Sequence, residues 1–163
     1  MKDKIIEESI ESLRREGLKF SVDTLAERLK VSKKTIYKYF PDKESLAVAL
    51  YESYYATTVR QAEALIGENT DLSHKKLLSL YFDSKVMTRR EIFNKYKLNK
   101  AISDCTVRYA DSLWNLISAS FPHSLSGEDK TALRVIVDGS LEKLCCDGSH
   151  SDAVIERLVY WLW

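Results

Sequence analysis

Apolar side chains return every three or four residues through almost the whole of this 163-residue chain, and this spacing constrains the fold most strongly. It places the apolar groups on one face of a helix, whereas a half-buried strand would need them at every second position. Only two prolines and five glycines interrupt the pattern, and 45% of the residues are apolar. The chain is therefore predicted to be all-α, with enough apolar surface for a packed core.

Capping residues divide the first part of the chain into short helices. Ser21 and Ser32 can each accept a hydrogen bond from the backbone that follows, which predicts helices at residues 22–29 and 33–39. Asp42 can cap a longer helix in the same way. Together with an amphipathic first helix, the two short helices predict a small N-terminal three-helix bundle.

Helix boundaries are less sharply marked in the rest of the chain. A helix is predicted to begin at Asp71 or Ser73, and further helices at 90–98, at 100–120, from Leu133 to Leu144, and from the 147–151 loop to Trp163. The stretch FPHSLSGED, residues 121–129, gives the clearest loop signal. The predicted domains are residues 1–47 and a larger helical unit, residues 48–163, joined by the long helix from Asp42.

Positive charge is concentrated near the second short helix. Residues 28–43 hold six basic residues and one acidic residue, although the whole chain has a net charge of only +1. Two short helices separated by three or four residues cross steeply and form a helix-turn-helix. The outward positions of the second helix are Lys33, Lys34, Thr35, Tyr37 and Lys38.

Such a helix fits the major groove of DNA, where its side chains reach base edges and flanking lysines meet phosphates. The alternative interpretation is that the lysines form only a solvated helix face. Their position on a capped, turn-containing helix pair favours DNA contact.

Residues 21–50, SVDTLAERLKVSKKTIYKYFPDKESLAVAL, resemble the DNA-binding module of TetR-type bacterial transcriptional regulators. The matching features are Leu25-Ala26, Val31-Ser32, Thr35-Ile36-Tyr37, Tyr39-Phe40 and Lys43-Glu44-x-Leu46. The resemblance implies that the base-facing residues are Lys33, Lys34, Thr35 and Tyr37. It implies that the phosphate contacts are Ser21, Ser32, Lys38, Tyr39 and Lys43. Beyond about residue 66 it is architectural only and implies a helical regulatory and dimerisation domain.

Three residues depart from the family pattern. Lys30 stands in a turn where the family commonly has glycine, so either its backbone is left-handed, at a cost of about 1 kcal/mol, or the turn differs. Lys34 also replaces a frequent glycine and adds a long cation at the expected DNA surface. Tyr39 replaces a common histidine and keeps a hydroxyl for a phosphate. The operator sequence therefore does not follow from the resemblance.

The resemblance also implies a homodimer, because one recognition helix reads only a half-site and two-fold symmetry matches a palindromic operator. The last helix is apolar on more than one stripe and so requires burial on two sides. The preceding helix carries a glycine that would let another helix approach closely. The candidate interface residues are Gly139, Val154, Leu158 and Trp161. The alternative is a last helix buried wholly within one subunit.

Catalytic and metal-binding motifs are absent from the sequence. There is no phosphate-binding glycine loop, HExxH or GxSxG pattern, and the three histidines lie far apart. No catalytic residue, metal site or cofactor is expected. No apolar run is long enough to span a membrane, and three cysteines without a CxxC pair suit a reduced, cytoplasmic setting.

The sequence thus predicts a cytoplasmic, dimeric regulator of double-stranded DNA, most simply a repressor released by a small-molecule effector. Aromatic residues at helical spacing form core more often than pocket, so no effector residue is assigned. One alternative is an activator or co-regulator controlled by a partner protein. Another is a small helical enzyme or carrier that binds a phosphorylated metabolite, which steeply salt-dependent binding to duplex DNA would contradict.

Overall fold

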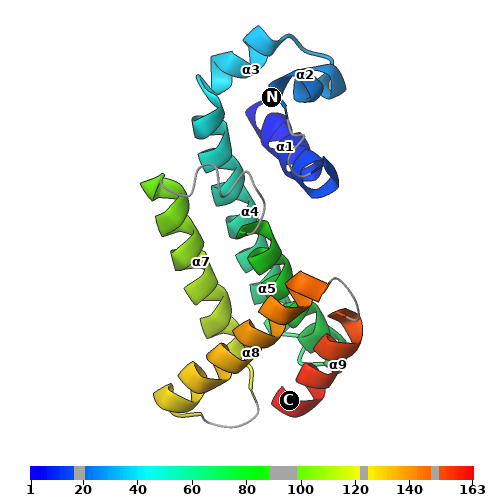
Figure 1. Cartoon of the computed structure of the whole chain (residues 1–163), viewed down its shortest axis with the longest axis vertical. Helices are drawn as coiled ribbons and strands as arrows, with labels where there is room; N and C mark the ends of the chain where they lie inside the picture. The colour runs from blue at the N-terminus through cyan, green and yellow to red at the C-terminus, as the bar shows by residue number, and fades with distance from the viewer. Residues whose placement is uncertain (17–20, 89–98, 122–124, 148–150) are drawn as a thin grey trace. The chain divides into compact units, whose positions relative to one another are not determined.

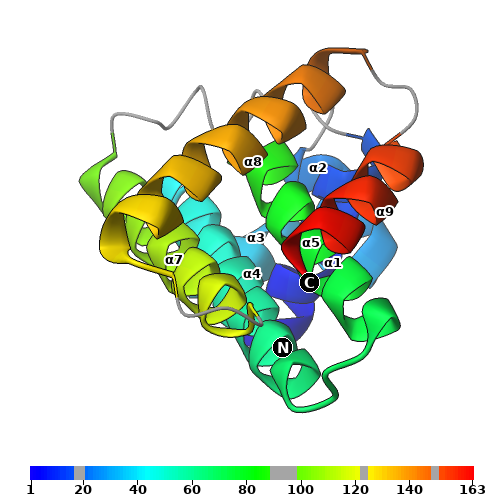
Figure 2. The same cartoon turned by 90° about the horizontal axis from the view of Figure 1, so that it is seen from below.

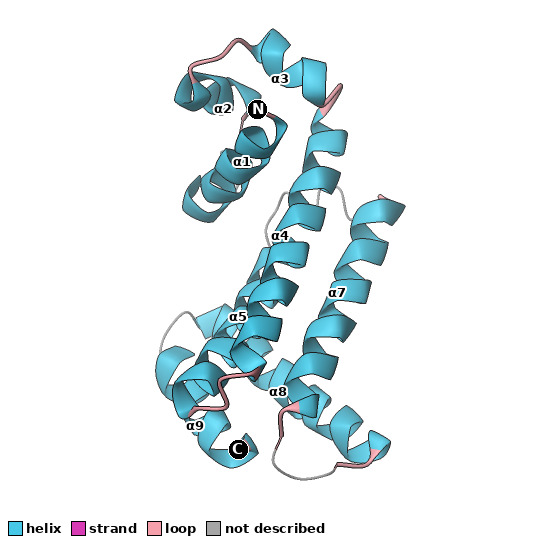
Figure 3. Ribbon diagram, turned by 180° about the vertical axis from the view of Figure 1, so that it is seen from behind, coloured by secondary structure: helices cyan, strands magenta, loops and turns pink. Residues whose placement is uncertain are grey.

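The computed structural model describes residues 1–16, 21–88, 99–121, 125–147 and 151–163. These ranges contain helices and no strand, so the predicted all-α fold is confirmed (Figures 1 and 3). The described helices are α1 (Lys2–Glu16), α2 (Val22–Leu29), α3 (Lys33–Tyr39), α4 (Lys43–Ile66), α5 (Asp71–Thr88), α7 (Lys100–Ala119), α8 (Gly127–Asp147) and α9 (Ser151–Leu162). The predicted helix at 90–98 lies outside the described residues.

The chain divides into two compact units. The first unit comprises Met1–Thr57 with Met87–Arg108, and the second comprises Thr58–Val86 with Tyr109–Trp163. This division follows helix packing, so α4, α5 and α7 each contribute residues to both units. The domain limits of 1–47 and 48–163 follow chain order instead and stay a prediction.

The two short helices begin and end where their caps predict. The Ser21 Oγ accepts a hydrogen bond from the Thr24 backbone at 3.1 Å, and the Ser32 Oγ accepts one from the Thr35 backbone at 3.1 Å. Lys30 ends α2 in the left-handed conformation, with φ 53° and ψ 42°. Of the two alternatives for this lysine, the left-handed backbone is therefore the one observed.

The start of α4 is fixed by a reciprocal pair of hydrogen bonds. The Asp42 Oδ1 accepts from the Ser45 backbone N–H at 2.7 Å, and the Asp42 N–H donates to the Ser45 Oγ at 3.3 Å. The bonds from the Ser45 backbone and hydroxyl hold the pKa of Asp42 below its ordinary value. The predicted cap is confirmed, and it places Lys43 in the first turn of the helix.

One later boundary matches the prediction and another differs from it. Helix α5 begins at Asp71, but its cap is Thr70, whose Oγ1 accepts from the Ser73 backbone at 3.1 Å. Helix α8 begins at Gly127, so the predicted loop at 121–129 is too long. The reason is a second reciprocal cap, in which the Ser126 Oγ accepts from the Asp129 backbone at 3.1 Å and the Asp129 carboxylate accepts from the Ser126 N–H at 3.2 Å.

The N-terminal helices of the first unit share an apolar core. Its buried members come from α1, α2, α3 and α4: Ile5, Ile6, Val22, Leu25, Ala26, Ile36, Phe40 and Leu46. These side chains carry no polar atoms and pack by apolar burial. Beside them, the Arg28 guanidinium of α2 donates to the Ser12 Oγ of α1 at 2.7 Å. Helix α3 contributes Ile36, which is 1% exposed, and this contact fixes which face of the short helix points outward.

The second unit has a more aromatic core with charged groups at its edge. Tyr81 and Trp114 lie in this core with their ring centroids 5.9 Å apart. The Tyr81 hydroxyl donates to the Asp138 carboxylate at 2.9 Å, and the Lys85 ammonium donates to the same carboxylate at 3.1 Å. The second unit therefore joins α5 to α8 through polar contacts as well as packing, while α9 packs beside α5 (Figure 2).

Candidate nucleic-acid interface

The outer face of α3 is determined by what its inner face buries. Ile36 and the C-capping Phe40 are 1% and 3% exposed. Tyr37 and Tyr39, which alternate with them, are each 40% exposed, a large fraction for an aromatic side chain. Packing of the two apolar side chains thus turns the tyrosines outward, where their rings and hydroxyls are available to a partner.

The exposed residues of α3 form one shallow concave surface. Its lining residues are Ser32, Lys34, Thr35, Tyr37, Lys38 and Tyr39. All six were singled out from the sequence as DNA contacts, and the structure brings them together. The other three candidates, Ser21, Lys33 and Lys43, are not among the lining residues.

The lysines of this region fall into two groups. Lys34, Lys38 and Lys43 are exposed, and none has an ion-pair partner within the described part of the chain. Lys33 is different, because its ammonium forms an ion pair with the carboxylate of Asp23 on α2. The cationic character of the concave surface therefore comes from Lys34 and Lys38.

Both candidate serines already serve as helix caps. Besides accepting a backbone hydrogen bond, the Ser21 hydroxyl lies 2.9 Å from the Thr24 hydroxyl, and the Ser32 hydroxyl lies 2.9 Å from the Thr35 hydroxyl. Their first effect is to fix the starts of α2 and α3. A phosphate contact from either serine would come in addition to this capping role.

Sequence reasoning missed two residues next to the candidate interface. Asp23 was not considered, although an acidic residue beside a basic segment was a visible signal. Asn99 caps α7 by accepting from the Ile102 backbone at 3.2 Å, and its side-chain amide also donates to Glu44 in the first turn of α4. This second contact joins segments 55 residues apart, so no local pattern could have indicated it.

The candidate dimer residues lie in different environments. Trp161 on α9 is 71% exposed, and a side chain at Gly139 on α8 would meet no atom within 4 Å. Leu158 is buried in the core of its own unit, and Val154 packs against that core. Exposed apolar residues that the sequence did not single out lie on the same two helices: Val135, Ile136 and Tyr160.

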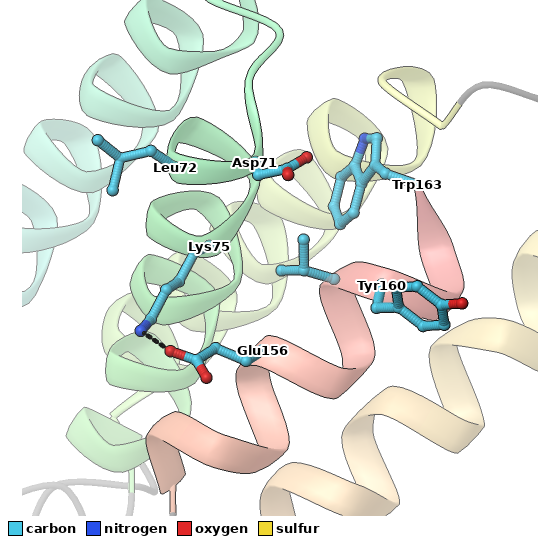
Figure 4. Close-up of a pocket in the computed structure, with 7 residues that line it drawn as sticks. Asp71, Leu72, Lys75, Glu156, Tyr160 and Trp163 are labelled. Atoms are coloured by element: carbon cyan, nitrogen blue, oxygen red, sulfur yellow. Dashed lines mark hydrogen bonds and ion pairs between the residues drawn. The ribbon is translucent and has the colours of Figure 1, made fainter.

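A pocket of about 560 Å³ lies between α5 and α9 within the second unit (Figure 4). An ion pair with an N–O distance of 2.6 Å between Lys75 and Glu156 crosses one side of it. Trp163 lines the other side and is held in place by a hydrogen bond from its Nε1 to the Ser120 carbonyl at 2.9 Å. The pocket volume is within the range of small-molecule sites.

His74 supports the Trp163 wall of this pocket from behind. The two rings stack with their centroids 4.3 Å apart, and the histidine is 6% exposed. Its Nε2 lies 3.2 Å from the Asn69 Oδ1, while its Nδ1 has no hydrogen-bond partner among the described residues. Burial lowers the pKa of His74 below 6.5, and the nearby Asp71 carboxylate opposes this shift.

The described ranges contain no cluster of three or more histidine, cysteine or acidic side chains that could hold a metal ion. None of their helices is long and apolar enough to cross a membrane.

The N-terminal residues match a known family of DNA-binding proteins. The family described as bacterial regulatory proteins, tetR family, matches residues 5–50. An uncharacterised HTH-type transcriptional regulator of Bacillus subtilis, YvaF, is 33% identical over 73 residues, which are 45% of this chain and 38% of YvaF. Another, Rv0472c of Mycobacterium tuberculosis, is 34% identical over 58 residues, which are 36% of this chain and 25% of that protein. The matches thus span less than two-fifths of these relatives' lengths.

Two solved structures resemble the chain over nearly its whole length. The regulator FadR from Bacillus subtilis, in complex with stearoyl-CoA, has a TM-score of 0.65 and 16% identity, covering 99% of this chain and 97% of FadR. The multidrug-binding protein EbrR, in complex with proflavin, has a TM-score of 0.63 and 14% identity, with 99% of each chain covered. At such low identity, these likenesses show the fold alone.

Proposed function

We propose that this chain is a TetR-type regulator that binds double-stranded operator DNA through α3 and regulates transcription rather than catalysing a reaction. The observation that carries the proposal is the concave surface on α3, which is lined by two lysines without an ion-pair partner among the described residues and by two exposed tyrosines. Cationic groups provide sequence-independent attraction to phosphates, and neighbouring polar groups read base edges.

We propose different tasks for the residues of this surface. Lys34, Thr35 and Tyr37 line it and would meet base edges in the major groove. Lys38 and Tyr39 would contact phosphates, as would Lys43 in the first turn of α4, where free backbone N–H groups also favour an anion. Ile36 and Phe40 hold the helix in place from behind.

We further propose that two copies of the chain associate through α8 and α9. Val135 and Ile136 are 68% and 59% exposed on α8, and Trp161 is 71% exposed on α9. The open space above Gly139 would admit a helix of the partner subunit. In this proposal Leu158 supports the interface from its own core and does not contact the partner.

DNA binding would be controlled by a shift in the equilibrium between two arrangements of the dimer. An effector that binds one arrangement more tightly would change the separation of the two α3 helices and release a repressor from DNA. FadR and EbrR carry small molecules in their structures, and the α5–α9 pocket offers this chain a small-molecule-sized site. A partner protein acting on the helical region is the second candidate for control. A cytoplasmic location is part of this proposal.

The DNA-binding proposal is tested by selection of bound sequences from random duplexes with the purified protein. We expect a palindromic site, and we expect Tyr37→Ala to lose discrimination between that site and other sequences. Lys43→Ala should weaken all sequences about equally, because it removes a phosphate contact. Lys76→Ala, an exposed lysine on α5, is the matched control and should retain both properties. Binding without any sequence preference, or full retention by Tyr37→Ala, would contradict the proposal.

The dimer proposal is tested by light scattering of two matched variants. Trp161→Glu places a charge in the proposed interface and should give a monomer with strongly reduced operator affinity. Val107→Glu changes an apolar residue on α7 that is 59% exposed and lies outside the α8–α9 face, and it should remain dimeric. If the Trp161→Glu variant remained dimeric, α9 would not be part of the interface.

A further inference from the structure

Asp23 is an acidic residue next to the proposed DNA-reading surface, and the role proposed for it rests on the DNA-binding function proposed above. Asp23 lies in the first turn of α2 and pairs with Lys33, the first residue of α3. The two side chains remain 59% and 58% exposed, so neither is buried in the core. The pair therefore bridges the two helices of the helix-turn-helix on its outer side.

We propose that Asp23 is a specificity-determining residue that holds Lys33 away from DNA. The geometry divides the basic residues at the start of α3 into two kinds. Lys34 lines the concave surface together with both tyrosines, whereas Lys33 is not among the residues of that surface and is directed to Asp23. The sequence assigned Lys33 to base contact from its outward position and from the resemblance. In this proposal it makes a positioning contact within the protein instead.

The charge of Asp23 has a second consequence. DNA affinity that is independent of sequence depends on the number of phosphates that cations neutralise. A carboxylate beside α3 repels phosphates and occupies one ammonium group, so it lowers affinity for every duplex. The loss is larger for non-specific duplexes, whose affinity is essentially all electrostatic, than for the operator, where base-edge contacts of Tyr37 and Thr35 also hold α3. The ratio between specific and non-specific affinity therefore rises.

An exposed ion pair contributes little to protein stability, and this makes the inference testable without unfolding the chain. Asp23→Asn keeps the side-chain shape and removes the charge. We expect the variant to bind non-specific duplex about three- to tenfold more tightly, with a salt dependence steeper by about one phosphate contact. The selected operator should gain less, so the specificity ratio should fall. Asp23→Glu, which can preserve the pair, should restore the wild-type ratio.

Two controls separate the ion pair from a simple change in net charge. Glu27→Gln removes an acidic charge from the exposed surface of the same helix and should not reproduce the effect. Lys33→Ala should cost more affinity in the Asp23→Asn background than in the wild type, because only there is Lys33 released to meet a phosphate. Lys38→Ala should cost the same in both backgrounds.

The measurement is fluorescence anisotropy of labelled duplexes, operator and scrambled, across a series of salt concentrations with the full-length chain. Equal affinities and salt slopes for Asp23→Asn and wild type would overturn the inference while leaving DNA binding intact. An equal gain in non-specific duplex affinity for Glu27→Gln would also overturn the inference while leaving DNA binding intact. Absence of salt-dependent duplex binding by the wild-type chain would instead overturn the proposed function on which the inference depends.

Discussion

The N-terminal core of the first unit and the core of the second unit place their polar side chains differently. Around α3, the buried residues are aliphatic apart from Phe40. The lysines and tyrosines of the concave surface point outward and have no ion-pair or hydrogen-bond partner in the part of the chain that the structure describes. In the second unit, the Asp138 carboxylate lies at the edge of an aromatic core and contacts three polar side chains: Tyr81, Lys85 and Arg134. The polar side chains on the concave surface of α3 are therefore available to an external partner. The polar side chains of the second unit instead hold its own helices together.

The largest expected effect is on the core behind α3. Ile36→Ala removes a side chain that is 1% exposed and should lower the free energy of unfolding by about 2–5 kcal/mol. Urea unfolding followed by circular dichroism measures this, with Val107→Ala as a control at an exposed position. A loss below about 1 kcal/mol, similar to that of a surface change, would mean that α3 does not depend on this core.

A smaller loss is expected from the polar contacts of the second unit. Asp138→Ala leaves the buried Tyr81 hydroxyl without its acceptor and should cost about 1–3 kcal/mol. Adding Tyr81→Phe removes the stranded donor, so the double variant should lose less than the sum of the two single variants. Additive losses in the same urea experiment would show that the two groups do not act together.

Acid should affect the second unit through His74, since residues 1–50 contain no histidine. Burial lowers the pKa of His74 in the folded state below 6.5, so the unfolded chain binds the proton more readily. The resulting stability is present above pH 6.5 and is lost as the pH falls toward the folded-state pKa. Unfolding measured at pH 7.5 and 5.5 should show a drop that His74→Gln reduces. An identical drop in that variant would exclude His74 as its cause.

The smallest expected effect is a gain at the turn between α2 and α3. Lys30 has a positive φ of 53°, which a glycine adopts without steric cost. Lys30→Gly should therefore raise stability by less than about 1 kcal/mol, because glycine also loses more backbone entropy on folding. Asn69, the other described non-glycine residue with positive φ, tolerates that conformation better, so Asn69→Gly should give no gain. Differential scanning calorimetry can compare the stability of the two variants. A lower stability for Lys30→Gly than for the wild type would contradict backbone strain at Lys30.

Local chemistry predicted the fold near α3 well. Ser21, Ser32 and Asp42 each cap the helix that their side chains indicated, because a cap involves only residues three positions apart. The same rule explains the error at Ser126, where a glycine and acidic residues read as a loop although Asp129 completes a cap. Boundaries were therefore predictable where the capping residue was recognised.

Contacts between distant segments could not be predicted in this way. The pairing of Lys33 with Asp23 depends on the turn that brings α2 and α3 together, and the contact of Asn99 with Glu44 depends on the packing of α7 beside α4. The apolar pattern of α9 could not separate Leu158, which faces its own core, from the exposed Trp161. Periodicity identifies apolar stripes but not what covers each of them.

The proposed function requires two copies of α3 to enter successive major grooves of one duplex. Its most direct test is the affinity of the wild-type protein for duplexes in which two selected half-sites are moved apart one base pair at a time. The account predicts one sharp maximum, with half-site centres about one helical turn (~34 Å) apart, and a large loss when half a turn is inserted. Affinity that does not change with the spacing would contradict it.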